Sequence, residues 1–130
     1  MRPLLMAIAA FLASVGLGTS AQAQTARELL HVCELLQSGM HAQGTQVFIP
    51  PGSDVAQCWG FIGAVQQYSI LVDQDGKTFL HARPKPDTTR TQVLRIFIEY
   101  ARSHLEKLGL PAAAVAVNAM ADAFPCEGKK

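Results

Sequence analysis

The sequence predicts a small all-α domain, a four-helix bundle-like fold that follows a signal peptide. Apolar residues recur at three- and four-residue spacing in four separate segments of the chain. Two of these segments begin with a capping box, in which a Thr and a Glu or Gln three residues later satisfy each other's backbone donors. The connecting segments show no alternation convincing enough to predict a sheet. We therefore assign residues 1–23 to the signal peptide and residues 24–130 to one helical domain.

The first 23 residues have the composition of a secretory signal peptide. Arg2 gives a positive start, residues 4–17 are almost entirely apolar, and Ala21-Gln22-Ala23 supplies a small-x-small cleavage pattern. The apolar run is short for a membrane span, so cleavage after Ala23 is favoured over a retained anchor. Cleavage would leave 107 of the 130 residues in an oxidising compartment outside the cytoplasm.

Charge and cysteine content narrow the classes of function. Because Arg2 lies in the signal peptide, the domain carries ten basic and ten acidic residues, without the basic excess of a nucleic-acid-binding protein. All three cysteines, Cys33, Cys58 and Cys126, lie in the domain. Thiols pair in an oxidising compartment, so an odd number leaves one cysteine without an intramolecular partner.

The first helix is predicted from a capping box and one apolar stripe. Thr25 and Glu28 form the capping box, and Gly39 is the expected terminator. His31 and His41 lie beside the stripe and are interpreted as surface residues. The stripe itself has three- and four-residue spacing and consists of Leu29, Val32, Cys33, Leu36 and Met40.

Residues 42–54 are predicted to form a loop with a stiff turn at residues 50–52. The apolar patch at residues 47–49 is expected to tuck beneath this loop, and Asp54 is expected to cap the next helix. That second helix should extend to about Leu71, with an inward face of Val55, Cys58, Trp59, Ile62 and Val65.

The second helix contains two glycines, which lower helical stability and therefore indicate close packing. Gly60 and Ala64 are four residues apart, so they share one face of the helix. We expect this face to let another backbone approach.

The connection to the third helix combines a turn with a proline-rich segment. Residues 73–76 have the beginning of a calcium-loop pattern, but Pro84 stands where that loop needs a bidentate glutamate. A turn at Gly76 and an extended segment over residues 77–80 are expected instead. Two prolines keep residues 83–87 out of a helix.

A long third helix is predicted from Arg90 to Leu108, with Thr89 and Gln92 as its capping box and Gly109 in a left-handed stop position. Its inward residues are Val93, Phe97, Tyr100, Ala101, His104 and Leu108. The last helix is predicted to begin at Pro111 and to end before Pro125. Its predicted inward residues are Ala113, Val117, Met120 and Phe124.

No catalytic constellation is present in the sequence. Cys33 with His31 could imitate a nucleophile and base, but residues two apart on a helix do not face each other. The chain has no His-Glu-x-x-His, no Gly-x-Ser-x-Gly and no phosphate-binding loop. We therefore predict no catalytic residue, no cofactor and no bound metal.

Three motifs in a fixed order resemble those of a known family. Cys58-Trp59-Gly60-Phe61-Ile62 matches a C-x-G-[YF]-[IV] signature, a long helix follows that ends in an aromatic-x-x-x-His-Leu stretch, and Phe124-Pro125-Cys126 closes the domain. With a signal peptide in front, this order resembles the Rap/Tai immunity family of type VI secretion. The resemblance covers nearly all of the domain. It departs from the family pattern at Ala64, where the signature has a second glycine.

The resemblance implies a periplasmic helical protein, often a homodimer, that binds a peptidoglycan amidase toxin and blocks its catalytic cleft. Producer cells would thereby survive toxins injected by their siblings. No nucleic acid and no membrane insertion after cleavage are implied. Two alternatives stay open: an acid-stress periplasmic chaperone, which the small number of acidic residues disfavours, and a family fold repurposed for another role.

The resemblance also accounts for the odd cysteine. Family members commonly carry a cysteine before the proline that precedes the third helix, and residues 80–84 of this chain have none. In an up-and-down bundle Cys33 and Cys58 share one end, whereas Cys126 lies near the place of the missing cysteine. We therefore expect a Cys33–Cys58 disulfide and a free thiol at Cys126, with a Cys58–Cys126 bond as the alternative.

If the protein blocks a toxin, the candidate contact surface is the proline-rich loop. Arg83, Lys85 and Asp87 alternate there with two prolines, which reduce the entropy lost on binding. The competing interpretation is a solvated connector between helices.

Overall fold

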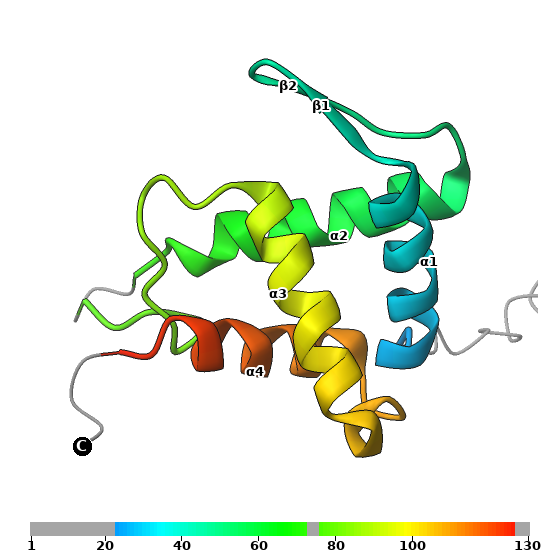
Figure 1. Ribbon diagram of the computed structural model, residues 1–130. Coiled ribbons are helices and arrows are strands. Elements are labelled where there is room, and N and C mark those ends of the chain that lie inside the picture. The colour runs from blue at the N-terminus through cyan, green and yellow to red at the C-terminus, as the bar shows by residue number, and fades with distance from the viewer. Residues whose placement is uncertain (1–22, 73–75, 127–130) are drawn as a thin grey trace, which may run out of the picture.

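The structure is a computed structural model that describes residues 23–72 and 76–126 (Figure 1). Its helices are α1 (Ala26–Gly39), α2 (Ser53–Ser69), α3 (Arg90–Ser103), the short 3-10 helix η1 (Leu105–Lys107) and α4 (Ala112–Ala123). Strands β1 (His41–Gln43) and β2 (Gln46–Phe48) form an antiparallel hairpin between α1 and α2. The predicted signal peptide lies almost wholly outside the described residues. Within them, no helix has the length and apolar character to cross a membrane.

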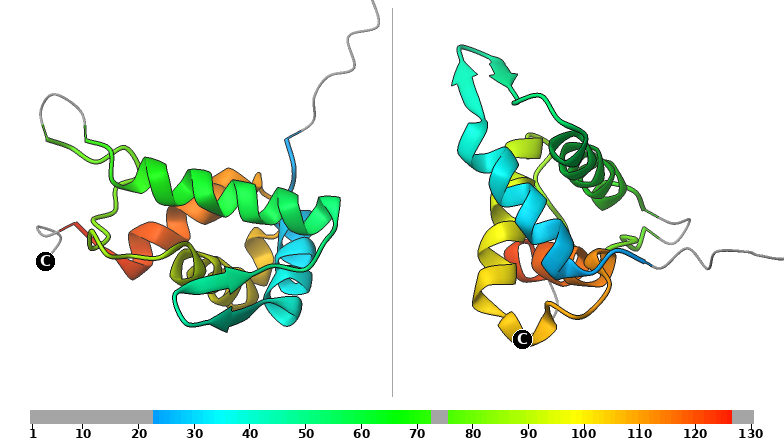
Figure 2. Two further views of the ribbon diagram at one scale, coloured as in Figure 1. Left: turned by 90° about the horizontal axis from the view of Figure 1, so that it is seen from above. Right: turned by 90° about the vertical axis from the view of Figure 1, so that its right-hand side faces the viewer.

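The four helices cross one another and do not form an up-and-down bundle. Figures 1 and 2 show α1 and α3 running across α2 and α4. The up-and-down order expected from the sequence is therefore wrong. Short connections favour antiparallel neighbours, whereas the connections over residues 40–52 and 70–89 are long enough to turn the chain between crossing helices.

Both predicted capping boxes are present. The Thr25 N–H donates to Glu28 Oε2 at 2.8 Å, and the Glu28 N–H donates to Thr25 Oγ1 at 3.3 Å. At the start of α3 the corresponding bonds join Thr89 and Gln92, at 2.7 and 3.2 Å. Each box satisfies backbone donors that a helix start leaves without partners.

One hydrophobic core lies where the four helices meet. Its largest fully buried side chains are Leu29, Leu36, Ile62, Leu94, Phe97, Ile98 and Met120. The start of α1 is joined to the α3–α4 connection by main-chain bonds, from Ala26 N to Leu110 O at 2.9 Å and from Ala112 N to Gln24 O at 2.8 Å. Thus most residues of the predicted stripes of the first and third helices lie in the core, and Gln24, just ahead of α1, is bonded to the start of α4.

The connection between α1 and α2 corrects the all-α prediction. Residues 42–54 were expected to be a loop, but Gly44, at a φ of 62°, turns the chain back into a hairpin. The apolar residues 47–49 are exposed and do not tuck beneath the connection. Asp54 does not cap α2 either, because the N-cap residue is Gly52 and no side chain bonds to the helix start.

The end of α3 and the face of α4 also differ from the prediction. The α-helix stops at Ser103, because His104 leaves the helical conformation with φ −131° and ψ 61°. Gly109 is not one of the described glycines that have a positive φ, so it does not supply the left-handed helix stop that the sequence predicts. In α4 the buried face is rotated from the predicted one, since Ala113 is exposed and the core takes up Ala112, Val115, Ala116, Ala119 and Met120.

Candidate protein-binding surface

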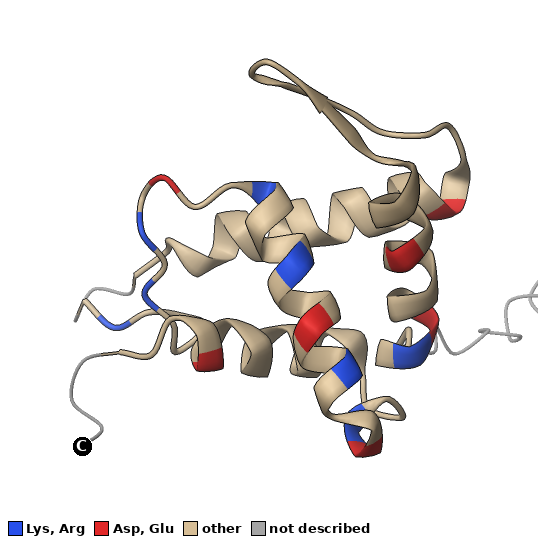
Figure 3. Cartoon of the chain, in the orientation of Figure 1, with Lys and Arg blue, Asp and Glu red and all other residues tan. Residues whose placement is uncertain are grey.

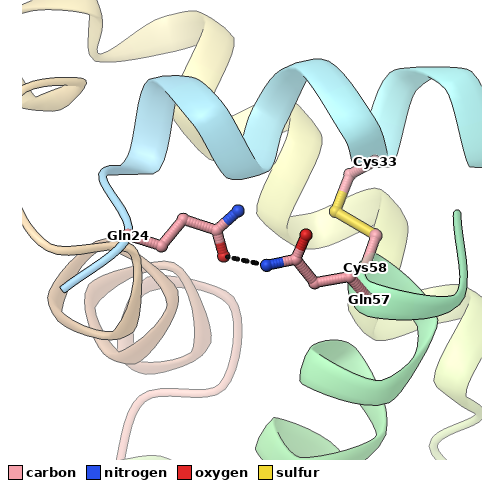
Figure 4. Close-up of a disulfide and its surroundings, with 4 residues drawn as sticks. All are labelled: Gln24, Cys33, Gln57 and Cys58. Carbon is pink, nitrogen blue, oxygen red and sulfur yellow. Dashed lines mark hydrogen bonds between the residues drawn. A yellow bond between two sulfur atoms is a disulfide. The ribbon is translucent and has the colours of Figure 1, made fainter. Parts of the chain in front are cut away.

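A buried disulfide joins α1 to α2. Cys33 and Cys58 are bonded, their Cα atoms are 5.3 Å apart, and both side chains are fully buried (Figure 4). Gln57 Nε2 of α2 also donates to Gln24 Oε1, in the segment just ahead of α1, at 3.3 Å. The pairing expected from the sequence is the one that the structure contains, and Cys126 is free. Because Cys33 is oxidised, it is not available as a nucleophile.

The glycines of the signature motif have roles different from those predicted. Gly60 faces solvent, with no atom within 4 Å of the position where a Cβ would stand, and Ala64 is also exposed. Gly63 is buried, and a Cβ there would lie 2.6 Å from the guanidinium carbon of Arg90. That guanidinium lies over the Trp59 ring, 4.8 Å from its centroid. The close approach in α2 therefore involves the Arg90 side chain at Gly63.

The carboxyl-terminal motif holds the segment that precedes α3. The Arg83 N–H donates to Phe124 O at 2.9 Å, and Pro125 forms a single antiparallel bridge with Ala82. Cys126 Sγ lies 3.6 Å from Thr78 Oγ1. These contacts place Cys126 beside residues 78–83, close to the position where the family resemblance leads one to expect a cysteine.

The proline-rich loop presents its charged side chains to solvent. Arg83, Lys85 and Asp87 are all exposed. The charged loop that carries them leads into the start of α3 (Figure 3). Thr88 N–H donates to Lys85 O at 3.0 Å, and Gln66 Nε2 of α2 donates to Thr88 O at 2.8 Å. The loop is thus bonded to the body of the domain while its charges point outward.

The β1–β2 hairpin is a second exposed feature, and sequence reasoning missed it. Every residue from 41 to 49 is exposed, including the apolar Val47, Phe48 and Ile49. The His41 and Phe48 rings stack across the two strands, with centroids 5.2 Å apart. Gly44-Thr45, a two-residue turn that begins with glycine, was the available signal, but the flanking segments are too short to show alternation.

An apolar depression lies between α2 and α4. It has a volume of about 210 Å³ and is lined by Phe61, Ala64, Val65, Tyr68, Leu80, Ala113 and Val117. Neither α2 nor the first turns of α4 carry a charged residue beyond Asp54. This face can therefore make apolar contacts without burying a charge.

Polar side chains gather at the carboxyl-terminal end of α3. The Tyr100 and His104 rings stack with centroids 4.0 Å apart, and Lys107 Nζ donates to Tyr100 Oη at 2.6 Å. That hydrogen bond raises the pKa of Lys107 above its usual value. Arg102 Nε pairs with Glu34 Oε1 of α1 at 2.9 Å. Over residues 23–72 and 76–126, no group of His, Cys, Asp and Glu is arranged to hold a metal ion.

The surfaces above are suited to non-covalent contact with another protein, and comparison with known proteins agrees with this. No curated protein and no solved structure matched the chain. A family model described as Rap1a immunity proteins matches residues 25–126, which include the disulfide and all three sequence motifs. The chain therefore belongs to the Rap1a immunity protein family.

Proposed function

We propose that this protein is a periplasmic immunity protein that binds and inhibits a peptidoglycan amidase toxin of type VI secretion. The observation that carries the proposal is the family match over residues 25–126, because immunity proteins act by binding a toxin partner. The buried Cys33–Cys58 disulfide supports export, since disulfides persist in oxidising compartments. The protein performs no chemistry of its own in this role.

Inhibition of an amidase requires competition with a large polymeric substrate. The complex must therefore be tight and dissociate slowly, with a few buried anchor residues supplying most of the binding energy. The domain has equal numbers of acidic and basic residues, which argues against long-range electrostatic steering as the main source of affinity. Apolar contact and a preorganised surface are the remaining sources.

The proline-rich loop is our proposed contact for the toxin cleft. Its charges are exposed, its prolines limit the entropy lost on binding, and its backbone is bonded to α2 and to residue 124. Arg83→Ala combined with Lys85→Ala should weaken inhibition while the far-UV circular dichroism spectrum stays unchanged. Arg27→Ala, which removes an exposed cation from α1, is the matched control.

The decisive experiment expresses each secreted amidase of the producing organism in the periplasm, with and without this protein. Protection from lysis by one amidase, together with a stable purified complex, would support the proposal. Equal lysis for every amidase would reject immunity and leave a repurposed family fold. A chaperone would instead protect unrelated periplasmic proteins at acid pH, without preference for an amidase.

The same purified material tests the oligomeric state. The family resemblance implies a homodimer, and we propose that the free protein self-associates. Light scattering coupled to size-exclusion chromatography measures the mass of the free protein and of the complex. A monomer at all concentrations would reject the dimer without affecting the immunity proposal.

A further inference from the structure

The β1–β2 hairpin contributes nothing to the hydrophobic core. All residues from 41 to 49 are exposed, and the hairpin projects beyond the helices (Figure 1, and Figure 2, right). Val47, Phe48 and Ile49 nevertheless keep 37 to 41% of their surface in contact with solvent. Exposed apolar side chains that follow one another on a projecting segment are typical of an interaction site.

Three contacts hold this segment in place although it buries no core residue. The Cys33–Cys58 disulfide closes the chain around it and ties the two helices at its base. Gly39, the last residue of α1, packs so closely on the Pro50 ring that a Cβ would lie 2.7 Å from Pro50 Cγ. The stacked rings of His41 and Phe48 join the two strands. A segment that is rigid before binding loses less conformational entropy in a complex.

We propose that the hairpin, residues 41–49, is a preorganised wedge that inserts into an apolar recess of the secreted toxin. This inference rests on the proposed immunity function and names a contact additional to the proline-rich loop. A projecting hairpin is convex, so its partner surface must be concave. In Figure 1 the hairpin projects above the helices toward the left, and the proline-rich loop runs up the left-hand side to the start of α3, so a partner that approaches from the upper left can contact both.

The charge pattern favours a protein recess over a membrane. No Asp, Glu, Lys or Arg occurs between Glu34 and Asp54 (Figure 3). Segments that insert into anionic membrane surfaces carry Lys or Arg beside their apolar residues, and this hairpin has none. An apolar protein recess requires no such charge. The strands have three residues each, which is short for pairing edge to edge with a second copy.

The first test changes the apolar side chains. The double variant Val47→Ser, Phe48→Ser should raise the Kd for the amidase bound by the wild-type protein at least a hundredfold, because it removes the apolar groups that would be buried in the toxin recess and the Phe48 ring that stacks on His41. Leu105→Ser is the matched control, since Leu105 is 66% exposed on η1 and should change the Kd less than threefold. Thermal unfolding and circular dichroism of the variants should match the wild type, because none of the three residues is buried.

The second test moves the hairpin without changing its side chains. Gly39→Ala forces the end of α1 and the Pro50 ring apart, so the Kd should rise about tenfold with the helical spectrum retained. Gly60→Ala is the control, because no atom lies within 4 Å of its added methyl group. Amide hydrogen exchange at residues 41–49 should slow in the wild-type complex.

The outcomes separate this inference from the function on which it rests. If the wild type binds the amidase and the double variant binds equally well, the wedge is wrong and the immunity function stands. If the wild type binds no amidase, both fail. Hairpin-dependent binding to anionic phospholipid vesicles, or loss of a homodimer in the double variant with unchanged amidase affinity, would also overturn the wedge.

Discussion

At position 63 any side chain would compete for space with the Arg90 guanidinium, whereas position 60 is open to solvent. Gly60→Ala should raise the free energy of unfolding by up to about 1 kcal/mol, the helix-propensity difference between the two residues. Gly63→Ala should not show this gain, because the methyl group displaces Arg90 from the Trp59 ring. Urea unfolding of both variants measures the difference.

A double-mutant cycle isolates the cause. In an Arg90→Ala background the space beside Gly63 is empty, so Gly63→Ala should then stabilise by about the same 1 kcal/mol as Gly60→Ala. A Gly63→Ala variant that is stabilised in the presence of Arg90 would show that the guanidinium relocates without cost. Such a result would remove the packing explanation for this glycine.

The sequence indicated that a glycine in α2 is needed for packing but pointed to the wrong one. Helical periodicity finds a face only where polar residues mark the opposite side. Between Val55 and Val65 the helix has Gln57 as its one strongly polar residue, so the pattern does not distinguish the face of Gly60 from that of Gly63. The partner, Arg90, is distant in sequence and carries no signal that it packs here.

Individual elements were predicted best where their signal is local. The two capping boxes each depend on four consecutive residues, and both helix starts are correct. The hairpin was missed because its strands have three residues and bury no side chain, so no alternation arises. The end of α3 was missed because His104 stops the helix where its ring stacks on Tyr100, which no helix-terminator rule anticipates.

The capping boxes of α1 and α3 should differ in how their contribution to stability changes at acid pH. The hydrogen bonds from the Thr25 backbone N–H and hydroxyl hold the pKa of Glu28 below its usual value of 4.5. A carboxyl group with a lowered folded-state pKa stabilises the fold above its unfolded-state pKa, and this contribution is lost as the pH falls through the folded value. The stability supplied by Glu28 should therefore decline below about pH 4.5.

Glu28→Gln tests this contribution. Gln92 shows that an amide oxygen serves the same position in α3, so the substitution should keep the cap and remove its acid dependence. Urea unfolding between about pH 7 and pH 3 should show a smaller acid loss than in the wild type. Gln92→Glu is the reciprocal variant and should gain an acid-dependent loss. Equal pH profiles for wild type and Glu28→Gln would contradict the assignment.

The Cys33–Cys58 disulfide should make a large contribution to the free energy of unfolding. Cys33→Ser should lower the free energy of unfolding by about 3.5 kcal/mol on the loop-entropy model, because the bond closes a separation of 25 residues. Cys126→Ser is the control and should have a much smaller effect, since Cys126 is partly exposed and forms no disulfide. Chemical denaturation measures both. Similar losses for the two variants would contradict a special role of the Cys33–Cys58 bond.

At the scale of the whole molecule, the number of helices and their apolar stripes were predictable but their crossing was not. An apolar stripe indicates that one face of a helix is buried, but it does not indicate which other helix packs against that face. Cys33 and Cys58 meet because α1 crosses the beginning of α2, not because both lie at one end of an up-and-down bundle. The expected pairing was therefore right although the arrangement used to reach it was wrong. The candidate binding surface could not be predicted for a similar reason, since exposed residues produce no periodic pattern in the sequence.

Export is the property of the whole chain on which immunity in the periplasm depends. We propose that residues 1–23 are removed and that the mature protein begins at Gln24. The contacts of Gln24 are compatible with this boundary, because Gln24 O accepts a hydrogen bond from Ala112 N at 2.8 Å and Gln24 Oε1 accepts one from Gln57. Cleavage after Ala23 leaves these contacts intact, whereas cleavage after Gln24 would remove them.

A variant without residues 2–23 should therefore fail to protect cells from a periplasmic amidase, because it stays in a reducing compartment apart from its target. Replacing the deleted segment with an unrelated cleavable signal peptide should restore protection. Lysis assays measure both effects, and the intact mass of periplasmic protein should correspond to residues 24–130 with one disulfide. Full protection by the variant that lacks residues 2–23 would contradict the periplasmic site of action, and a periplasmic mass that still includes Met1 would contradict the proposed cleavage.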